Sequence, residues 1–294
     1  MSVWVDHFSL AVQSLDEAEA FFSRYLPLVA LGGSSSGADG EVRARLYQLG
    51  HVKLALVESA RAGSFLERFL ARRGEGIHHL ALRTADLAPI AASLEEAGFT
   101  VVEVPASATA RRAIGVRPQD ASGMFLLIGE TDDAPPARPA AAERIVAMPG
   151  VDANMVFDHL AAAVPGIEPV KKFFAQHFPV TRDGGTHRGY AGDFDISQFE
   201  LAGYRFELIS DASGTSFIVP FLAKRGPGFH HLSIDVDRID PILDRMRADG
   251  LRIVDEADLG YGYKTAFVSP RSAHGVLVQF WQVPDLTNED FADR

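Results

Sequence analysis

The chain contains an internal repeat at a fixed offset of 152 residues, and this repeat constrains its fold more than any other feature. Five blocks of the first half return in the second half without a gap. They begin at Asp6, Lys53, Gly76, Gly98 and Gly123, and their counterparts begin at Asp158, Arg205, Gly228, Gly250 and Gly275. Three pairs of histidines coincide at this offset, where chance would give about 0.2 pairs. Such a repeat indicates two copies of one architecture.

A shorter spacing of 72 residues lies within each half. It separates His7 from His79 and His159 from His231. The chain therefore divides into four modules of roughly 70 to 80 residues. Hydrophobic patterning predicts a strand, a helix and three further strands in each module, so the expected fold class is α+β with four βαβββ modules.

Local signals place several of these elements. Strands are expected at 3–12 and 156–164, and the capping-box pattern Ser14-Leu15-Asp16-Glu17 predicts a helix over 18–25. Further strands are expected at 80–84, 204–209, 232–236 and 276–281, and further helices at 87–97 and 239–248, which Gly98 and Gly250 end.

Residues 131–150 separate the two halves. Their content of Pro, Ala and charged residues is typical of a connector. We therefore expect a first domain at 1–132, a linker at 133–150 and a second domain at 151–294.

Composition excludes several classes of protein. Of the 294 residues, 47% are hydrophobic, which is enough for globular cores, and none is cysteine, which excludes disulfides and thiolate ligands. The net charge of −11 disfavours binding to nucleic acid or to anionic membranes. No secretory signal and no apolar run of membrane-spanning length is visible, so a cytoplasmic location is expected.

Four positions that the repeat makes equivalent carry different chemistry in the two halves. The second half has His159, Glu207, His231 and Gln279, and all four side chains can coordinate a divalent cation. The first half has His7, Ala55, His79 and Leu127, so both oxygen ligands are replaced by aliphatic residues. The sequence therefore predicts a metal site in the second half and a degenerate site in the first.

Strand alternation is consistent with this site. Glu207, His231 and Gln279 each oppose apolar neighbours that would form the core, so they are expected to project into a cleft. The alternation gives no answer for His159, because residues 160–164 are apolar on both faces. His78 and His230 would face the opposite side and are expected to pack.

The four ligand candidates and the motifs around them resemble the vicinal oxygen chelate superfamily, especially methylmalonyl-CoA epimerase and glyoxalase I. The resemblance covers nearly the whole chain and rests on the Asp-His pairs and on the segments 69–79, 221–231 and 269–278. It implies two tandem domains, each a pair of βαβββ modules forming a curved mixed sheet around a cleft. By position, it assigns the metal ligands to His159, Glu207, His231 and Gln279.

One departure from this family affects the expected mechanism. The family usually has Glu where this chain has Gln279, and an amide cannot accept a proton. Glu207 is the remaining carboxylate of the set and is expected to act as ligand or base. Asp193 and Asp195 lie near the region where epimerases carry an additional acid, so Asp195 is a candidate substrate-binding residue. His274 is the second such candidate, although a surface position is commoner for a histidine of this kind.

The leading hypothesis is an epimerase, isomerase or lyase that transfers a proton alpha to a carbonyl. Two alternatives stay open: an Fe(II)-dependent extradiol or 4-hydroxyphenylpyruvate-type dioxygenase, and an antibiotic-sequestering binding protein. The cofactor would be Zn, Ni, Co, Mn or Fe(II), and neither a nucleotide nor a flavin is implied. The partner would be a small molecule, and the chain is expected as a monomer or homodimer. Several basic residues could meet an anionic substrate: Lys171, Lys172, Arg182, Arg188, Lys224 and Arg225.

Overall fold

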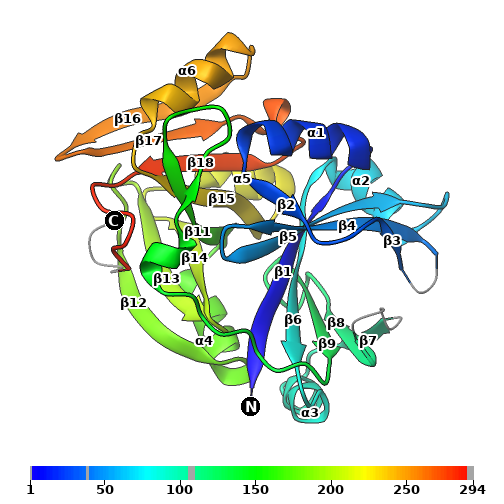
Figure 1. Ribbon diagram of the computed structural model, residues 1–294. Helices are drawn as coiled ribbons and strands as arrows, with labels where there is room; N and C mark the ends of the chain where they lie inside the picture. Colours follow the sequence, from blue (N-terminus) through cyan, green and yellow to red (C-terminus); the bar gives the residue numbers. More distant parts are fainter. Residues whose placement is uncertain (1, 38–39, 105–109, 290–294) are drawn as a thin grey trace.

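The computed structural model describes residues 2–37, 40–104 and 110–289. They form two nine-stranded mixed sheets, one coloured blue to green and the other green to red in Figure 1. The first sheet contains β1 (Val3–Ala11), β2 (Leu28–Ala30), β3 (Ser35–Ser36), β4 (Val42–Leu49), β5 (Val52–Ser59), β6 (Gly76–Thr84), β7 (Val101–Val104), β8 (Arg112–Val116) and β9 (Phe125–Glu130).

The second sheet repeats this arrangement. It contains β10 (Val146–Ala147), β11 (Asn154–Ala163), β12 (Val180–Arg188), β13 (Phe194–Leu201), β14 (Tyr204–Asp211), β15 (Gly228–Val236), β16 (Ile253–Gly260), β17 (Tyr263–Val268) and β18 (Leu277–Gln282). The helices are α1 (Leu15–Tyr25), α2 (Phe65–Arg73), α3 (Ala88–Glu96), α4 (Ile167–His177), α5 (Ile218–Arg225) and α6 (Asp240–Ala248), with short 3-10 turns η1 (Ala141–Arg144) and η2 (Pro270–Ser272).

Strand order confirms the predicted modules. The first sheet runs β2-β4-β5-β1-β6-β9-β8-β7 and the second β12-β13-β14-β11-β15-β18-β17-β16. In each sheet the first strands of two modules, β1 with β6 and β11 with β15, pair antiparallel at the centre. The fold is therefore two tandem pairs of βαβββ modules.

The structure contains the helix start predicted at Ser14 and the helix end predicted at Gly98. The Ser14 hydroxyl accepts a hydrogen bond from the Glu17 backbone N–H, although α1 already begins at Leu15. Gly98 follows α3 with a positive φ of 84°, a conformation that ends a helix at little cost for glycine.

Two helices were missed from the sequence, α2 and α5. They follow β5 and β14 and so lie between modules, outside the order of one strand, one helix and three strands that is expected within each module. Tertiary packing stabilises them: α5 buries Ile218 against Ala163 and Ile209 of the second sheet. The expected linker also contains ordered elements, because β10 pairs with β11.

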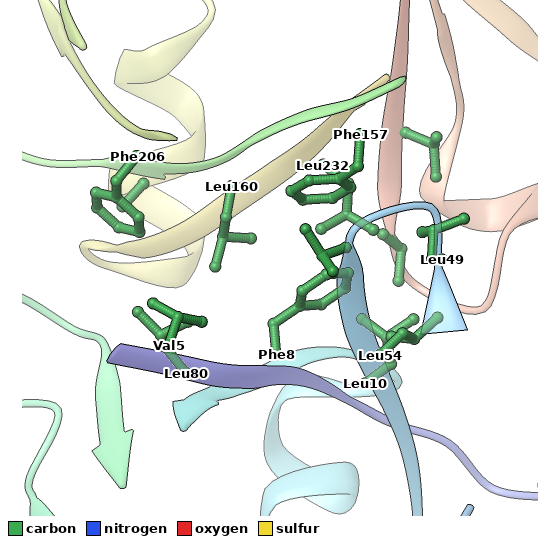
Figure 2. Close-up of a cluster of buried hydrophobic side chains, with 14 of the residues drawn as sticks. Val5, Phe8, Leu10, Leu49, Leu54, Leu80, Phe157, Leu160, Phe206 and Leu232 are labelled. Carbon is green, nitrogen blue, oxygen red and sulfur yellow. The ribbon is translucent and has the colours of Figure 1, made fainter. Parts of the chain in front are cut away.

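The two sheets share one hydrophobic core. Phe8 of β1 stacks on Phe157 of β11 with ring centroids 5.3 Å apart, and Figure 2 shows further apolar residues of both sheets meeting around them. Helices add symmetric contacts across the same boundary. Tyr25 of α1 donates a hydrogen bond to Asp249 at 2.8 Å, and Ser93 of α3 contacts the ring of His177 of α4 at 2.9 Å.

His51 lies half-buried near Phe157 and Tyr204 of the second sheet and makes the fold sensitive to acid. Burial, with the nearby charges of Arg144 and Arg138, lowers the pKa of His51 from 6.5 to about 4, against a smaller opposing effect of Asp158. The unfolded chain therefore binds a proton between pH 6.5 and pH 4 that the folded chain does not bind.

We expect His51 to have no effect on the pH dependence of stability above pH 6.5, where it is neutral in both states. As the pH falls from 6.5 to 4, it should lower the free energy of unfolding by about 3 kcal/mol. Denaturant unfolding across this range should show a shallower pH dependence for His51→Phe, because Phe packs near Phe157 and Tyr204 without titrating. His187→Phe on β12 is the matched control. An unchanged slope in His51→Phe would contradict the assignment.

Among the described residues, none of the helices combines the length and the apolar character needed to cross a bilayer.

Candidate metal centre

Three of the predicted ligands converge in the second sheet. His159 lies on β11, Glu207 on β14 and His231 on β15, and these strands are adjacent in the order β14-β11-β15. The backbone register explains the meeting point, because Ala161 of β11 pairs with Glu207 on one side and with His231 on the other. His159 is two residues from Ala161 and shares its face. The small side chain of Ala161 leaves room between the three larger ones.

The atoms facing this point are evenly spaced. His159 Nε2 lies 3.2 Å from His231 Nε2 and 3.5 Å from Glu207 Oε1, and His231 Nε2 lies 3.6 Å from the same oxygen. All three side chains are buried. Adjacent ligands of a divalent ion are about 3.0 to 3.4 Å apart. Two imidazoles and a carboxylate at these separations fit a divalent transition metal.

Neighbouring side chains hold each ligand in place. Asp158 contacts His159 Nδ1 at 2.7 Å and so keeps Nε2 free of a proton when a cation binds. Gln198 Nε2 donates to Glu207 Oε2 at 2.8 Å, which leaves Oε1 facing the histidines. His230 Nδ1 lies 2.9 Å from His231 Nδ1. The centre therefore has an ordered second layer of polar contacts.

The electrostatics of the group favour a cation. Burial by itself would raise the pKa of Glu207, but the charge and hydrogen bond of His159, with help from His231 and Gln198, hold that pKa at about 2. Burial likewise opposes protonation of His159, yet Glu207 and Asp158 raise its pKa to about 9. One proton thus sits on His159 beside an ionised carboxylate, and a bound cation would displace it.

Gln279, the fourth predicted ligand, lies beside the other three on β18. Its amide Nε2 donates to Thr265 Oγ1 at 3.1 Å. The amide nitrogen is therefore directed away from the centre. Gln279, Leu277 and Trp281 all line the same cavity, as strand alternation predicts.

A cavity with a volume of about 280 Å³ contains the candidate metal centre in its wall. Its other lining residues are mostly apolar or aromatic and include Tyr190, Phe194, Ile196, Phe217 and Phe267. Asp255 adds a carboxylate to the wall.

The sequence profile of the glyoxalase/bleomycin resistance protein/dioxygenase superfamily matches residues 6–115 and again 158–267. The chain belongs to this superfamily. The Bacillus subtilis (strain 168) uncharacterized protein YqjC is 35% identical over 77 residues, which are 26% of this chain and 54% of that protein. The chain thus aligns with about half the length of this relative. Mitochondrial methylmalonyl-CoA epimerase of Bos taurus is 27% identical over 136 residues, 42% of this chain and 73% of that protein.

A solved structure supports the two-domain fold over its full length. A triple mutant of 4-hydroxymandelate synthase from Streptomyces coelicolor superposes with a TM-score of 0.64 at 17% identity, covering 96% of this chain and 92% of that one. The superfamily fold thus accounts for both sheets, and members of the superfamily typically use a divalent metal.

Within this superfamily fold, the first domain keeps only part of the centre. The place of Ala161 is taken by Ser9, whose hydroxyl lies 3.0 Å from His79 Nε2. Asp6 still contacts His7 at 3.0 Å, but Ala55 and Leu127 supply no oxygen. In the first domain, His79 therefore contacts Ser9. In the second domain, the equivalent His231 faces His159 and Glu207.

Two predicted substrate-binding residues, Asp195 and His274, are not among the residues that line the 280 Å³ cavity. Asp195 alternates with the lining residues Phe194 and Ile196, so it faces the other side of β13, where it pairs with Arg188 at 3.0 Å. His274 has a positive φ of 47° and contacts Glu75 of the first domain at 3.1 Å. His230 packs on Phe221, as predicted, but also contacts the ligand His231.

Gln198, Asp158 and Asp255 were not predicted as site residues. The repeat contained the signal for Gln198, because its counterpart in the first half is Leu46, another polar-to-aliphatic difference. In the sequence, Asp158 stands out only as part of the repeated Asp-His pair. Asp255 carried no local signal, since its place in the cavity depends on how β16 lies beside the rest of the sheet.

Proposed function

We propose that the second domain is a metal-dependent enzyme centre that transfers a proton alpha to a substrate carbonyl. The convergence of His159, Glu207 and His231 in a cavity wall carries this proposal. A divalent cation held there would act as a Lewis acid and stabilise negative charge on the substrate oxygen. A coenzyme A thioester is the proposed substrate class, from the name of the epimerase relative.

The carboxylates that line the cavity have different contacts and therefore different roles. Glu207 has one oxygen toward the histidines and the other bound by Gln198, which favours a ligand role over a proton-transfer role. Asp158 is bound to His159 and to Arg205 at 2.8 Å. Asp255 is the third carboxylate of the cavity wall. We therefore assign the proton transfer to Asp255. Gln279 would be a neutral ligand, so a bound cation would keep more of its positive charge and be a stronger electrophile.

Asp255→Asn tests this division. We expect hydrogen exchange at C2 of methylmalonyl-CoA in D₂O, followed by NMR, to fall about 100-fold or more, because an amide cannot accept the proton. Metal content should remain unchanged, since Asp255 is not a ligand. Asp258→Asn on the same strand is the control and should keep the wild-type rate. Exchange that survives in Asp255→Asn would refute the assignment of Asp255.

The same three ligands also support a second candidate function. Two histidines and one carboxylate in a converging triangle are the ligand content of non-haem Fe(II) oxygenases. Oxygen uptake by the Fe(II)-loaded protein with arylpyruvates or catechols, without exchange of substrate protons, would favour this dioxygenase function over proton transfer.

A further inference from the structure

A second cavity of about 890 Å³ lies between the two domains and is called here the interdomain cleft. Its walls come from corresponding parts of both domains: α2 with the start of β6, and α5 with the start of β15. It lies beside the metal-centre cavity, because His230 and Leu277 line both. Its volume is in the range of small-molecule sites.

Four arginines line this cleft in a chain whose net charge is −11: Arg68, Arg72, Arg73 and Arg225. Within the described part of the chain, Arg72, Arg73 and Arg225 form no ion pair with a carboxylate. Glu75 is the acidic residue of the lining, and it is already engaged by His274 and by the Gln13 backbone N–H.

These positive charges approach one another across the domain boundary. Besides burial, the charges of Arg72 and Arg225 lower the pKa of Arg73, which shows that all three share one region. Arg73 also reaches the second domain, where its Nη1 lies near Gly228. A group of unneutralised arginines repels itself, and a bound anion relieves that repulsion.

The rest of the lining offers hydrogen bonds and apolar contact. His78 and His230 each use Nδ1 on the neighbouring histidine, so Nε2 remains the second polar atom of each ring. Phe69 packs edge-on against His78 at 4.6 Å, and Phe65 and Phe125 extend the apolar wall. A lone inorganic ion would fill little of this volume, whereas an organic phosphate could use both kinds of surface.

We propose that the interdomain cleft binds a phosphate-bearing small molecule, with Arg72, Arg73 and Arg225 holding the phosphate. Arginine suits this role because its planar group of N–H donors matches phosphate oxygens. The phosphate could belong to the tail of a substrate whose other end enters the metal-centre cavity, or to a separate molecule. Binding in the cleft requires no metal, so this proposal stands or falls independently of the proposed enzyme activity.

Calorimetric titration of the full chain in EDTA and low salt tests it, with ADP and inorganic pyrophosphate as probes and adenosine as the uncharged comparison. We expect saturable binding of both phosphates, about tenfold weaker in Arg73→Gln and lost in Arg73→Gln with Arg225→Gln. Arg112→Gln, an exposed arginine on β8, is the matched control and should bind as wild type. Absence of saturable binding, or equal weakening by Arg112→Gln, would overturn the proposal.

A competition experiment separates the two sources of the phosphate. If it belongs to the substrate, saturating ADP should weaken methylmalonyl-CoA binding, and Arg73→Gln should weaken both ligands. If it belongs to a separate molecule, methylmalonyl-CoA should bind equally well with and without ADP. Circular dichroism and unfolding of each variant show that its fold is intact, so a lost affinity reports on the cleft.

Discussion

Glu207→Ala is expected to lower the affinity for Zn(II) or Mn(II) by more than about 100-fold, the largest functional effect of any single change at the centre. Glu207 is the one anionic ligand of the triangle, and both neighbouring imidazoles are neutral when a metal is bound. Without the carboxylate, two imidazoles and an amide remain. Metal content by elemental analysis and affinity by competition with a chelator are the measurements.

Two further variants show whether Glu207 acts as a ligand. Glu207→Gln keeps the shape but removes the charge, and its single oxygen can either accept from Gln198 or face the histidines, so it should recover only part of the affinity. Gln198→Leu copies the residue found at the equivalent place in the first domain and should lower affinity by about tenfold, because it frees the second carboxylate oxygen. Stoichiometric metal in purified Glu207→Ala with an unchanged dissociation constant would show that the triangle is not the metal site.

Gly123→Ala is expected to destabilise the fold by about 4 kcal/mol or more, the largest structural effect. Gly123 has a φ of 84°, and a Cβ at this position would overlap the carbonyl oxygen of Pro227 in the second domain. Gly275 repeats the arrangement with a φ of 75° against the carbonyl of Glu75. Neither obstacle is a side chain that could turn aside, so the domains themselves would have to separate.

Gly98→Ala is the matched control for this prediction. Gly98 has the same φ of 84°, but no atom lies within 4 Å of the place where its Cβ would be. It therefore carries the backbone strain of a left-handed residue, about 1 kcal/mol, without the overlap. Urea unfolding of Gly123→Ala, Gly275→Ala and Gly98→Ala should separate the two effects. Equal midpoints for Gly123→Ala and Gly98→Ala would mean that the domains do not meet as described.

The fold could be predicted from the sequence because the repeat supplied information that local patterns lack. A single histidine in a strand does not predict a fold. The pairs His7 with His159 and His79 with His231 predict where the modules begin and in what order they follow. The helices α2 and α5 could not be predicted from the repeated module, because each of them connects one module to the next. Their stability comes from contacts with the sheets, such as Ile218 on Ile209.

The site could be predicted only for residues whose repeat partners differ. Glu207 stands where the first half has Ala55, and this contrast revealed its importance. Nearness in sequence to the repeated motifs indicates Asp195 and His274, but it does not determine the direction of a side chain. Asp195 faces away because β13 alternates, and His274 meets Glu75, a contact between residues 199 positions apart.

The shared core has a consequence for the degenerate first domain. Phe157, Leu160, Phe206 and Leu232, which lie behind the metal centre, are covered by Val5, Phe8 and Leu80 of the first domain (Figure 2). A second domain on its own would leave this apolar surface in water. The chain is thus arranged like a dimer joined into one polypeptide, in which the half without a full ligand set supplies packing surface to the other half.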